Sequence, residues 1–262
     1  MMPRRLAHLL LTAPKRCRGQ LARALHGTAG WRVLRTLYRS CAPLWKNPLV
    51  SSLAFVLRRW LYRTDPRGYW ELEGGRRYME DEAFLLGPRS ATEMQGQFLA
   101  AEIRALGAAS VLEVGCGYGR MLKEIREGAD VRLCGVDFSR SQLEAEREYV
   151  APAAIPVVLA DATRGLPFGD AAFDLVYTQG CLMHVPPPSD RAFRSELARV
   201  ARRHIIHTEE FNDSVHVFAH DNEQHYRALG YRLIKGIPYP YNPPGQNLTF
   251  SVFERQAASS DH

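Results

Sequence analysis

The stretch that decides the fold is VLEVGCGYGR, residues 111–120. A short, mainly apolar run, which predicts a buried strand, leads into a turn that contains Gly115, Gly117 and Gly119. Because glycine has no Cβ atom, the backbone can turn tightly there and approach a ligand closely. A helix that starts near Gly119 would present N–H groups at its positive end. The stretch therefore predicts a strand–turn–helix unit that holds a nucleoside-type cofactor.

The glycine spacing narrows the choice of cofactor. A dinucleotide-binding loop reads GxGxxG and cradles a pyrophosphate, whereas this loop reads GxGxG. Glu113 stands two residues before the first glycine. Its negative charge is unfavourable beside a pyrophosphate but favourable beside a cation. S-adenosylmethionine (SAM) carries both an ammonium and a sulfonium group, so these residues favour SAM and argue against a nicotinamide oxidoreductase.

Short β-rich runs alternate with helical stretches after residue 110, and an amphipathic helical pattern covers residues 90–106. The predicted strands are 111–114, 131–136, 155–160, 173–177, 204–208, 231–235 and 248–253. This alternation predicts a mostly parallel sheet that is covered by helices on both faces.

Two acids follow the second and third predicted strands. Asp137 lies 24 residues after Glu113, where a carboxylate can accept hydrogen bonds from both ribose hydroxyls. Asp161 ends the third strand, and LPFGD (166–170) precedes the fourth. In this order the elements resemble the class I SAM-dependent methyltransferases, and among them the group that includes the ubiquinone and menaquinone biosynthesis enzymes. The likeness covers roughly residues 90–255 and implies a seven-stranded α/β sandwich whose last strand is antiparallel.

The resemblance also implies which residues bind SAM. Asp137 would bind the ribose, Phe138 would lie against the adenine, and Asp161 would bond to the adenine amino group. The expected cofactor-binding set is Glu113, Gly115, Cys116, Gly117, Gly119, Asp137, Phe138, Asp161, Ala162 and Gln179. A departure is that many relatives have a Leu-Lys-Pro-Gly-Gly turn before the fifth strand, whereas this chain reads ARRHIIH there (201–207). That difference weakens an assignment to a quinone pathway and leaves the cofactor site untouched.

The methyl acceptor should lie beyond the carboxyl ends of the strands. After the fourth strand, His184 is a candidate general base for an oxygen nucleophile, because histidine ordinarily titrates near neutral pH; the alternative is a histidine that only packs or orients the loop. Glu209 and Glu210 follow the fifth strand and could steer a cationic or hydroxylated acceptor. Methyl transfer relies chiefly on proximity and orientation, so a dedicated base could be absent. The histidines lack compact ligand spacing, and no metal is expected.

NPPG (242–245) resembles a motif of amino-group methyltransferases that act on nucleobases or glutamine, but in those enzymes it follows the fourth strand. Here it falls between the last two predicted strands, where it predicts a stiff loop. Nucleic acid is therefore not an expected partner, and no RNA-binding module accompanies the basic charge.

The first part of the 262-residue chain is strongly basic. Residues 1–70 contain 14 Lys and Arg and one acid, Asp65, against 20 basic and 27 acidic residues in the remainder. Amphipathic helices in residues 1–63 would suit an anionic membrane surface, which gives a cytoplasmic, peripheral location. Two alternatives stay open: these helices dock on the catalytic domain, or Met1–Gly30 is a mitochondrial transit peptide. The five cysteines lack CxxC spacing and are expected to be reduced.

We therefore expect four parts: a basic helical extension (1–68), a helical cap or lid (69–108), a SAM-binding methyltransferase domain (109–256) and a tail (257–262). The expected reaction moves a methyl group to an oxygen or nitrogen of a small acceptor, which the basic extension suggests is hydrophobic or lipid-linked. The alternative is a non-catalytic module that binds SAM or a partner.

Overall fold

The computed structural model describes residues 62, 66–75, 78–79, 89–150, 154–210, 217–243 and 246–257. The chain divides into two compact units, Met1–Leu72 and Glu73–His262. In the first unit, Tyr69 makes edge-to-face contacts with Tyr62 and Trp70 at centroid distances of 5.3 and 5.4 Å. Most of the predicted basic extension lies outside the described residues. Among the described helices, none is long and apolar enough to cross a membrane.

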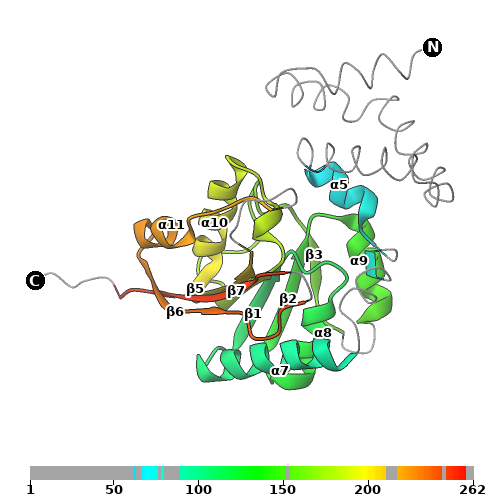
Figure 1. Ribbon diagram of the computed structural model, residues 1–262, viewed down its shortest axis with the longest axis horizontal. Coiled ribbons are helices and arrows are strands. Elements are labelled where there is room, and N and C mark those ends of the chain that lie inside the picture. Colours follow the sequence, from blue (N-terminus) through cyan, green and yellow to red (C-terminus); the bar gives the residue numbers. More distant parts are fainter. Residues whose placement is uncertain are drawn as a thin grey trace, which may run out of the picture. The chain divides into compact units, whose positions relative to one another are not determined.

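A seven-stranded sheet forms the centre of the second unit, with the strand order β3-β2-β1-β4-β5-β7-β6 (Figure 1). All neighbouring pairs are parallel except those of β7, which runs antiparallel to β5 and β6. The strands are β1 (Ser110–Val114), β2 (Arg132–Asp137), β3 (Val157–Leu159), β4 (Phe173–Gln179), β5 (Ala201–Glu209), β6 (Tyr231–Pro238) and β7 (Thr249–Arg255). The predicted fold, a mostly parallel sheet with an antiparallel last strand, is confirmed.

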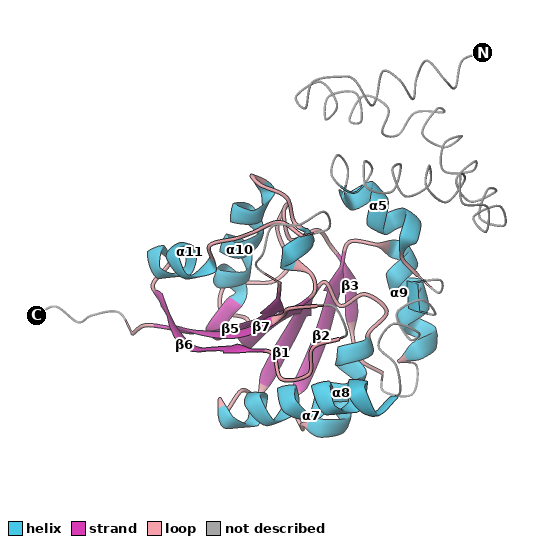
Figure 2. Ribbon diagram, in the orientation of Figure 1, coloured by secondary structure: helices cyan, strands magenta, loops and turns pink. Residues whose placement is uncertain are grey.

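Helices cover both faces of this sheet (Figures 1 and 2). Three of them pack on one face: α7 (Arg89–Ala105), α8 (Arg120–Gly128) and α9 (Arg140–Tyr149). The other face is covered by α10 (Ser189–Val200) and α11 (Asn222–Ala228). The remaining described helices are α5 (Pro66–Glu73) and the short 3-10 helix η3 (Leu182–His184), which follows β4.

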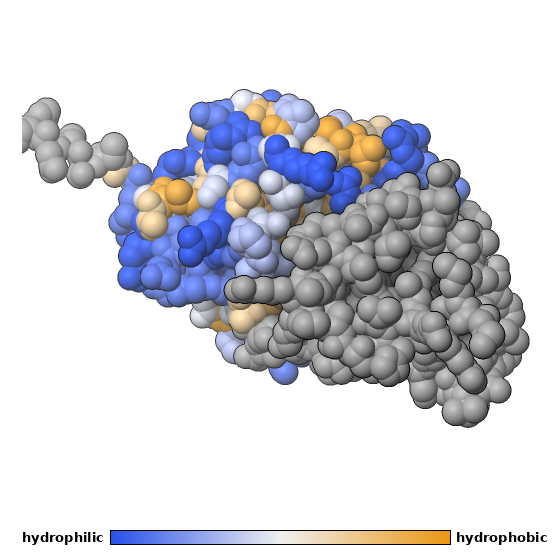
Figure 3. Space-filling view, turned by 90° about the horizontal axis from the view of Figure 1, so that it is seen from above, coloured by the Kyte–Doolittle hydropathy of each residue, from blue (hydrophilic) through white to orange (hydrophobic). Residues whose placement is uncertain are grey.

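Alternation along β1 explains why the sheet needs helices on both sides. Val111 points into the core beneath α7 and α8, whereas Leu112 points into the core beneath α10 and α11. Every residue of β1 is buried, as is typical of a central parallel strand. Each fully buried aliphatic side chain contributes about 1.5–3 kcal/mol of transfer free energy, so the two cores fix the strand in register. The described surface seen in Figure 3 is mainly hydrophilic, with smaller apolar areas.

The strand order places the functional loops together. From β1 the chain first steps to β2 and β3 on one side, and then to β4 and β5 on the other. In such sheets ligands bind outside the carboxyl ends of the strands, at the point where the order reverses. The loops after β1, β2 and β4 therefore meet at one edge, because β1 pairs with both β2 and β4.

Candidate functional site

The glycine loop after β1 is folded tightly against its neighbours. The N–H groups of Gly115 and Cys116 both donate to the carbonyl of Val136, at 2.7 and 3.0 Å. Gly115 has a φ of +79°, and a Cβ atom there would lie 2.7 Å from the Cβ of Cys181 and still closer to its sulfur. Gly117 differs, because its Cβ would meet nothing nearer than the Gln142 amide at 3.7 Å. The loop is therefore packed less closely at Gly117 than at Gly115.

Asp137 ends β2 directly beside this loop and is only 8% exposed. One carboxylate oxygen accepts the N–H of Gly117 at 2.9 Å, and the other accepts the N–H of Ser139 at 2.8 Å. Burial raises the pKa of Asp137 to about 6, against the opposing effect of these backbone hydrogen bonds. The carboxylate thus joins the glycine loop to the start of α9 at the position where the ribose was expected.

The site carries a concentration of negative charge. Glu113 is buried, at 3% exposure, on the strand that leads into the loop. Burial raises the pKa of the Cys116 thiol, and the carboxylates of Asp137 and Glu113 raise it further. Burial and the same two carboxylates, with Glu209, also raise the pKa of the Cys181 thiol. Both thiols stay protonated at neutral pH, and the surrounding field favours a cationic ligand.

The residues expected on the adenine side follow β2 and β3. Asp161 accepts two hydrogen bonds from Thr163, from its N–H at 3.0 Å and its hydroxyl at 2.6 Å. Ala162 is buried in the core beneath α10, and Phe138 is half-buried next to Asp137. The two loops are adjacent, because β2 and β3 pair in parallel up to Asp137.

A buried glutamine that no sequence pattern singled out joins several elements near the glycine loop. Gln95 of α7 is 2% exposed, and its Oε1 accepts Nη1 of Arg120 at 2.7 Å and Nε2 of Gln179 at 3.3 Å. Its Nε2 donates to the carbonyl of Tyr241 at 2.9 Å. Gln179, a predicted cofactor residue, also accepts a hydrogen bond from the Tyr177 hydroxyl. Gln95 therefore links α7, α8, the end of β4 and the β6–β7 loop.

The candidate acceptor residues lie at the carboxyl ends of β4 and β5. His184 is half-buried in η3, and its N–H donates to the carbonyl of Cys181 at 3.0 Å. Glu210 is half-buried directly after β5. Glu209, by contrast, is fully buried and accepts hydrogen bonds from the chain's own donors. The sequence placed this carboxylate facing the acceptor, and the structure instead engages it inside the protein.

Comparisons with known proteins agree with this arrangement. A family model described as a methyltransferase domain matches residues 111–204. The O-methyltransferase resE of Aspergillus sclerotiorum is 30% identical over 139 residues, 52% of this chain and 47% of that protein. The sterol 24-C-methyltransferase of Debaryomyces hansenii is 28% identical over 177 residues, 63% of this chain and 43% of that protein.

A solved structure shares the fold. The magnesium protoporphyrin IX methyltransferase of Synechocystis PCC 6803, crystallised with bound SAM, superposes with a TM-score of 0.59 at 16% identity and covers 74% of this chain and 97% of its own. The chain is thus similar to methyltransferases in sequence over residues 111–204, and it shares its fold with a SAM-dependent enzyme. It matches just under half the length of the two curated relatives.

The residues present fit the cofactor of a class I methyltransferase. The Asp137 carboxylate lies directly beside the glycine loop, and its oxygens can accept hydrogen bonds from hydroxyl groups. Glu113 and Asp137 supply the negative field that a sulfonium and an ammonium require. Among the described residues, no group of His, Cys, Asp and Glu side chains could hold a metal ion.

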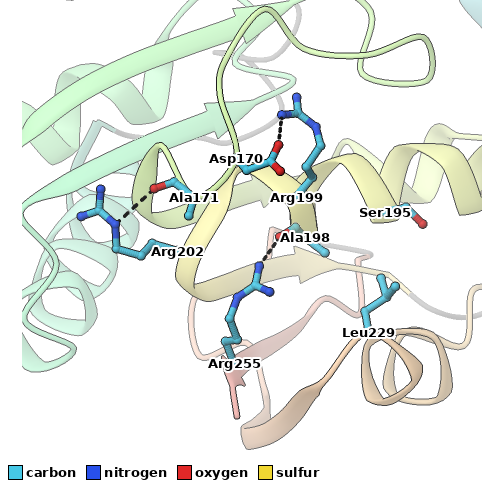
Figure 4. Close-up of a pocket in the computed structure, with 8 residues that line it drawn as sticks. All are labelled: Asp170, Ala171, Ser195, Ala198, Arg199, Arg202, Leu229 and Arg255. Carbon is cyan, nitrogen blue, oxygen red and sulfur yellow. Dashed lines mark hydrogen bonds and ion pairs between the residues drawn. The ribbon is translucent and has the colours of Figure 1, made fainter. Parts of the chain in front are cut away.

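A hollow of about 430 Å³ elsewhere in the second unit is not part of that site (Figure 4). It lies at the amino ends of the parallel strands, near the start of β5 and the end of β7. Its cationic side chains have acidic or carbonyl partners: Arg199 pairs with Asp170 and Arg202 with Asp174, and Arg255 donates to carbonyls at the end of α10. The hollow therefore offers little net charge for an anion.

Proposed function

We propose that this protein is a SAM-dependent methyltransferase that moves a methyl group to an oxygen or nitrogen of a small, hydrophobic or lipid-linked acceptor. The observation that carries the proposal is the Asp137 carboxylate, which is buried beside the glycine loop at the switch point of the sheet. The acceptor class is supported by the resE relative, which is an O-methyltransferase by name. The sterol relative acts on a carbon by name, so the test must identify the atom that is methylated.

The chain's own residues would bind, orient and shield the reactants. When bound, SAM supplies an electrophilic methyl group on a positively charged sulfur. Asp137 would hold the ribose, and Glu113 would favour the cationic end of the cofactor. The turn that contains η3 would form the acceptor wall, with His184 as the group that accepts a hydroxyl proton. Orientation of this kind can supply about 7–11 kcal/mol of a displacement barrier, so a base is a secondary contribution.

Titration calorimetry with SAM, and with NADH as a control ligand, tests the cofactor. Transfer of tritium from methyl-labelled SAM to a panel of phenols, carboxylic acids, amines and a total lipid extract tests the reaction, and mass spectrometry of the labelled product identifies the methylated atom. We expect SAM to bind and NADH not to bind. Binding of SAM with no labelling of any acceptor would favour the non-catalytic SAM-binding module instead.

We also propose that the basic extension, residues 1–63, brings the enzyme to an anionic membrane surface on the cytoplasmic side. The positive charge of this region supports the proposal, because residues 1–70 contain 14 Lys and Arg and only one acid. Deletion of residues 1–60 should lower binding to phosphatidylserine-containing vesicles and leave SAM affinity unchanged. Equal vesicle binding by the two proteins would refute this role, and cleavage after mitochondrial import would favour a transit peptide.

A further inference from the structure

We propose that Glu209 is a positioning residue that holds the turn after β4 (residues 181–184, called the acceptor turn) in place for methyl transfer. The inference rests on the proposed function, because it assigns this turn to the acceptor side of the site. Glu209 lies on β5, 25 or more residues away in sequence from the turn. Nothing in its local sequence pattern predicts this contact.

The geometry is that of a helix cap supplied from another strand. Oε1 of Glu209 accepts the N–H groups of Cys181 and Leu182, both at 3.1 Å, and Oε2 accepts the N–H of Met183 at 3.2 Å. The first N–H groups of a helix have no partner within the helix. The N-cap residue of η3, Cys181, makes no side-chain capping hydrogen bond. The carboxylate of Glu209 therefore satisfies three consecutive N–H groups at the start of η3.

This position fits a carboxyl group and not the corresponding amide. Burial raises the pKa of Glu209, and the hydrogen bonds from Thr178 and from the backbone oppose this shift. The hydroxyl of Thr178 also donates to Oε1, at 2.7 Å, so two oxygens receive four hydrogen bonds. A glutamine side chain has the same shape but replaces one oxygen by an NH2 group, which would face backbone N–H donors in either orientation. A buried donor that loses its acceptor costs more than the hydrogen bond itself contributes. Glu209→Gln is therefore a sharp change with almost no change in volume.

A series of buried hydrogen bonds holds the Glu209 carboxylate in place on the side away from the acceptor turn. The single hydroxyl proton of Thr178 goes to Glu209, so Thr178 must accept from Nδ1 of His207, at 2.7 Å. Nε2 of His207 must then accept from the hydroxyl of Tyr226, at 2.9 Å. All of these groups are buried, and burial lowers the pKa of His207 to about 3, which keeps its ring neutral. This hydrogen-bond series fixes one orientation for each of its side chains, from Tyr226 in α11 to Glu209 at the acceptor turn.

The carbonyls of the turn are held separately. Nε2 of His220 lies 3.0 Å from the carbonyl of Leu182, and the N–H of Phe218 donates to the carbonyl of Met183 at 2.9 Å. The side chain of Cys181 lies against Gly115 of the cofactor loop. The acceptor turn is thus fixed between Glu209 on one side and the glycine loop on the other. Loss of the hydrogen bonds to Glu209 would let the acceptor turn, which faces the transferred methyl group, move.

The test compares Glu209→Gln with Glu196→Gln in the full chain. Glu196 is the matched control, because its carboxylate also accepts a backbone N–H, that of Leu166, but at the far end of the sheet. Hydrogen–deuterium exchange follows the amides of residues 181–183, calorimetry gives the Kd for SAM, and tritium transfer from SAM to the lipid extract and phenol panel gives the rate. The exchange measurement needs no activity, and SAM binding and labelling by the unmodified protein test the proposed function by themselves.

In Glu209→Gln, loss of these hydrogen bonds should raise exchange of the three amides about 10- to 100-fold. The transfer rate should fall by about 10- to 100-fold through misplacement of the turn, while the Kd for SAM stays within about threefold. Glu196→Gln should leave all three values unchanged. Wild-type exchange in Glu209→Gln, an unchanged transfer rate, or equal effects of the control would overturn the inference. If Glu209→Gln does not fold, exchange of these amides in the unmodified protein decides: protection supports the role, and exchange at the rate of an open turn refutes it.

Discussion

Gly115→Ala should destabilise the protein for two separable reasons. The first is backbone conformation, because Gly115 has a φ of +79° and a left-handed conformation costs an L-residue about 1–2 kcal/mol. The second is crowding, because the new methyl group would lie 2.7 Å from the Cβ of Cys181 and closer to its sulfur. Forcing an extra methyl group into a packed site typically costs about 1–3 kcal/mol. The total expected loss of unfolding free energy is therefore about 2–5 kcal/mol.

Gly230 offers a matched control for the first contribution. Its φ is also +79°, but a Cβ atom there would meet nothing within 4 Å. Gly230→Ala should therefore lose only the conformational part, about 1–2 kcal/mol. Urea denaturation of both variants measures the difference, which we expect to be about 1–3 kcal/mol. Equal destabilisation of the two variants would show that the crowding against Cys181 is absent.

A second substitution checks the partner of the clash. Cys181→Gly removes both atoms that approach the added methyl group, so Gly115→Ala should cost about 1–3 kcal/mol less in that background. Strict additivity of the two substitutions would refute the contact between the glycine loop and the acceptor turn. The double variant should also recover SAM affinity relative to Gly115→Ala, because the loop no longer has to move.

Two further predictions concern buried charges. The pKa of Asp137 rises from 3.8 to about 6 on folding, so the unfolding free energy of the ligand-free protein should rise as pH falls from about 7 toward 4. SAM affinity should instead fall below pH 6, because the carboxylate that accepts the ribose hydroxyls is protonated there. Thermal melts with and without SAM between pH 5 and 7.5 should show both trends, and Asp137→Asn should remove them. If the SAM affinity of the unmodified protein did not change with pH, Asp137 would not be the ribose ligand. Arg194 and Asp190 form an ion pair, and their side chains are only 5% and 10% exposed. Arg194→Met should therefore lower the unfolding free energy, measured in urea, by about 3–5 kcal/mol and leave the Kd for SAM unchanged. A loss below about 1 kcal/mol would show that the remaining Asp190 charge finds another partner or solvent.

The sequence predicted the strands well because their apolar runs are buried on both sides. All seven predicted strands are present, and β1 begins within one residue of its expected start, at Ser110. The last two strands run further than predicted: β6 continues to Pro238 and β7 to Arg255. β6 is the edge strand and is largely exposed, so its apolar pattern is weaker, and β7 is exposed only at its last residue.

The site was harder to predict where it depends on contacts between distant residues. Gln95 sits among polar neighbours in an amphipathic helix, and no local pattern separates a buried glutamine from an exposed one. The hydrogen-bonded chain from Tyr226 to Glu209 had a partial signal, because His207, Thr208 and Glu209 are consecutive polar residues at the end of a core strand. Such a run indicates either a site or a buried network, and only the spatial partners of each side chain distinguish them.

The three glycines of the loop show how much of a cofactor motif belongs to the fold itself. A Cβ on Gly115 would collide with Cys181, and a Cβ on Gly119 would lie 2.5 Å from Val150 of the segment that ends α9. Both positions therefore require glycine for packing, whatever ligand is bound. Gly117 differs, because a Cβ atom there would make only an ordinary contact with Gln142 at 3.7 Å, although its φ of +56° still favours glycine. The spacing GxGxG is thus in large part a requirement of chain packing, and the choice of a cationic nucleoside rests more on the acids around the loop. Substituting Gly115 should consequently lower fold stability whether or not a ligand is bound, whereas substituting Asp137 should also remove the carboxylate that the ligand needs.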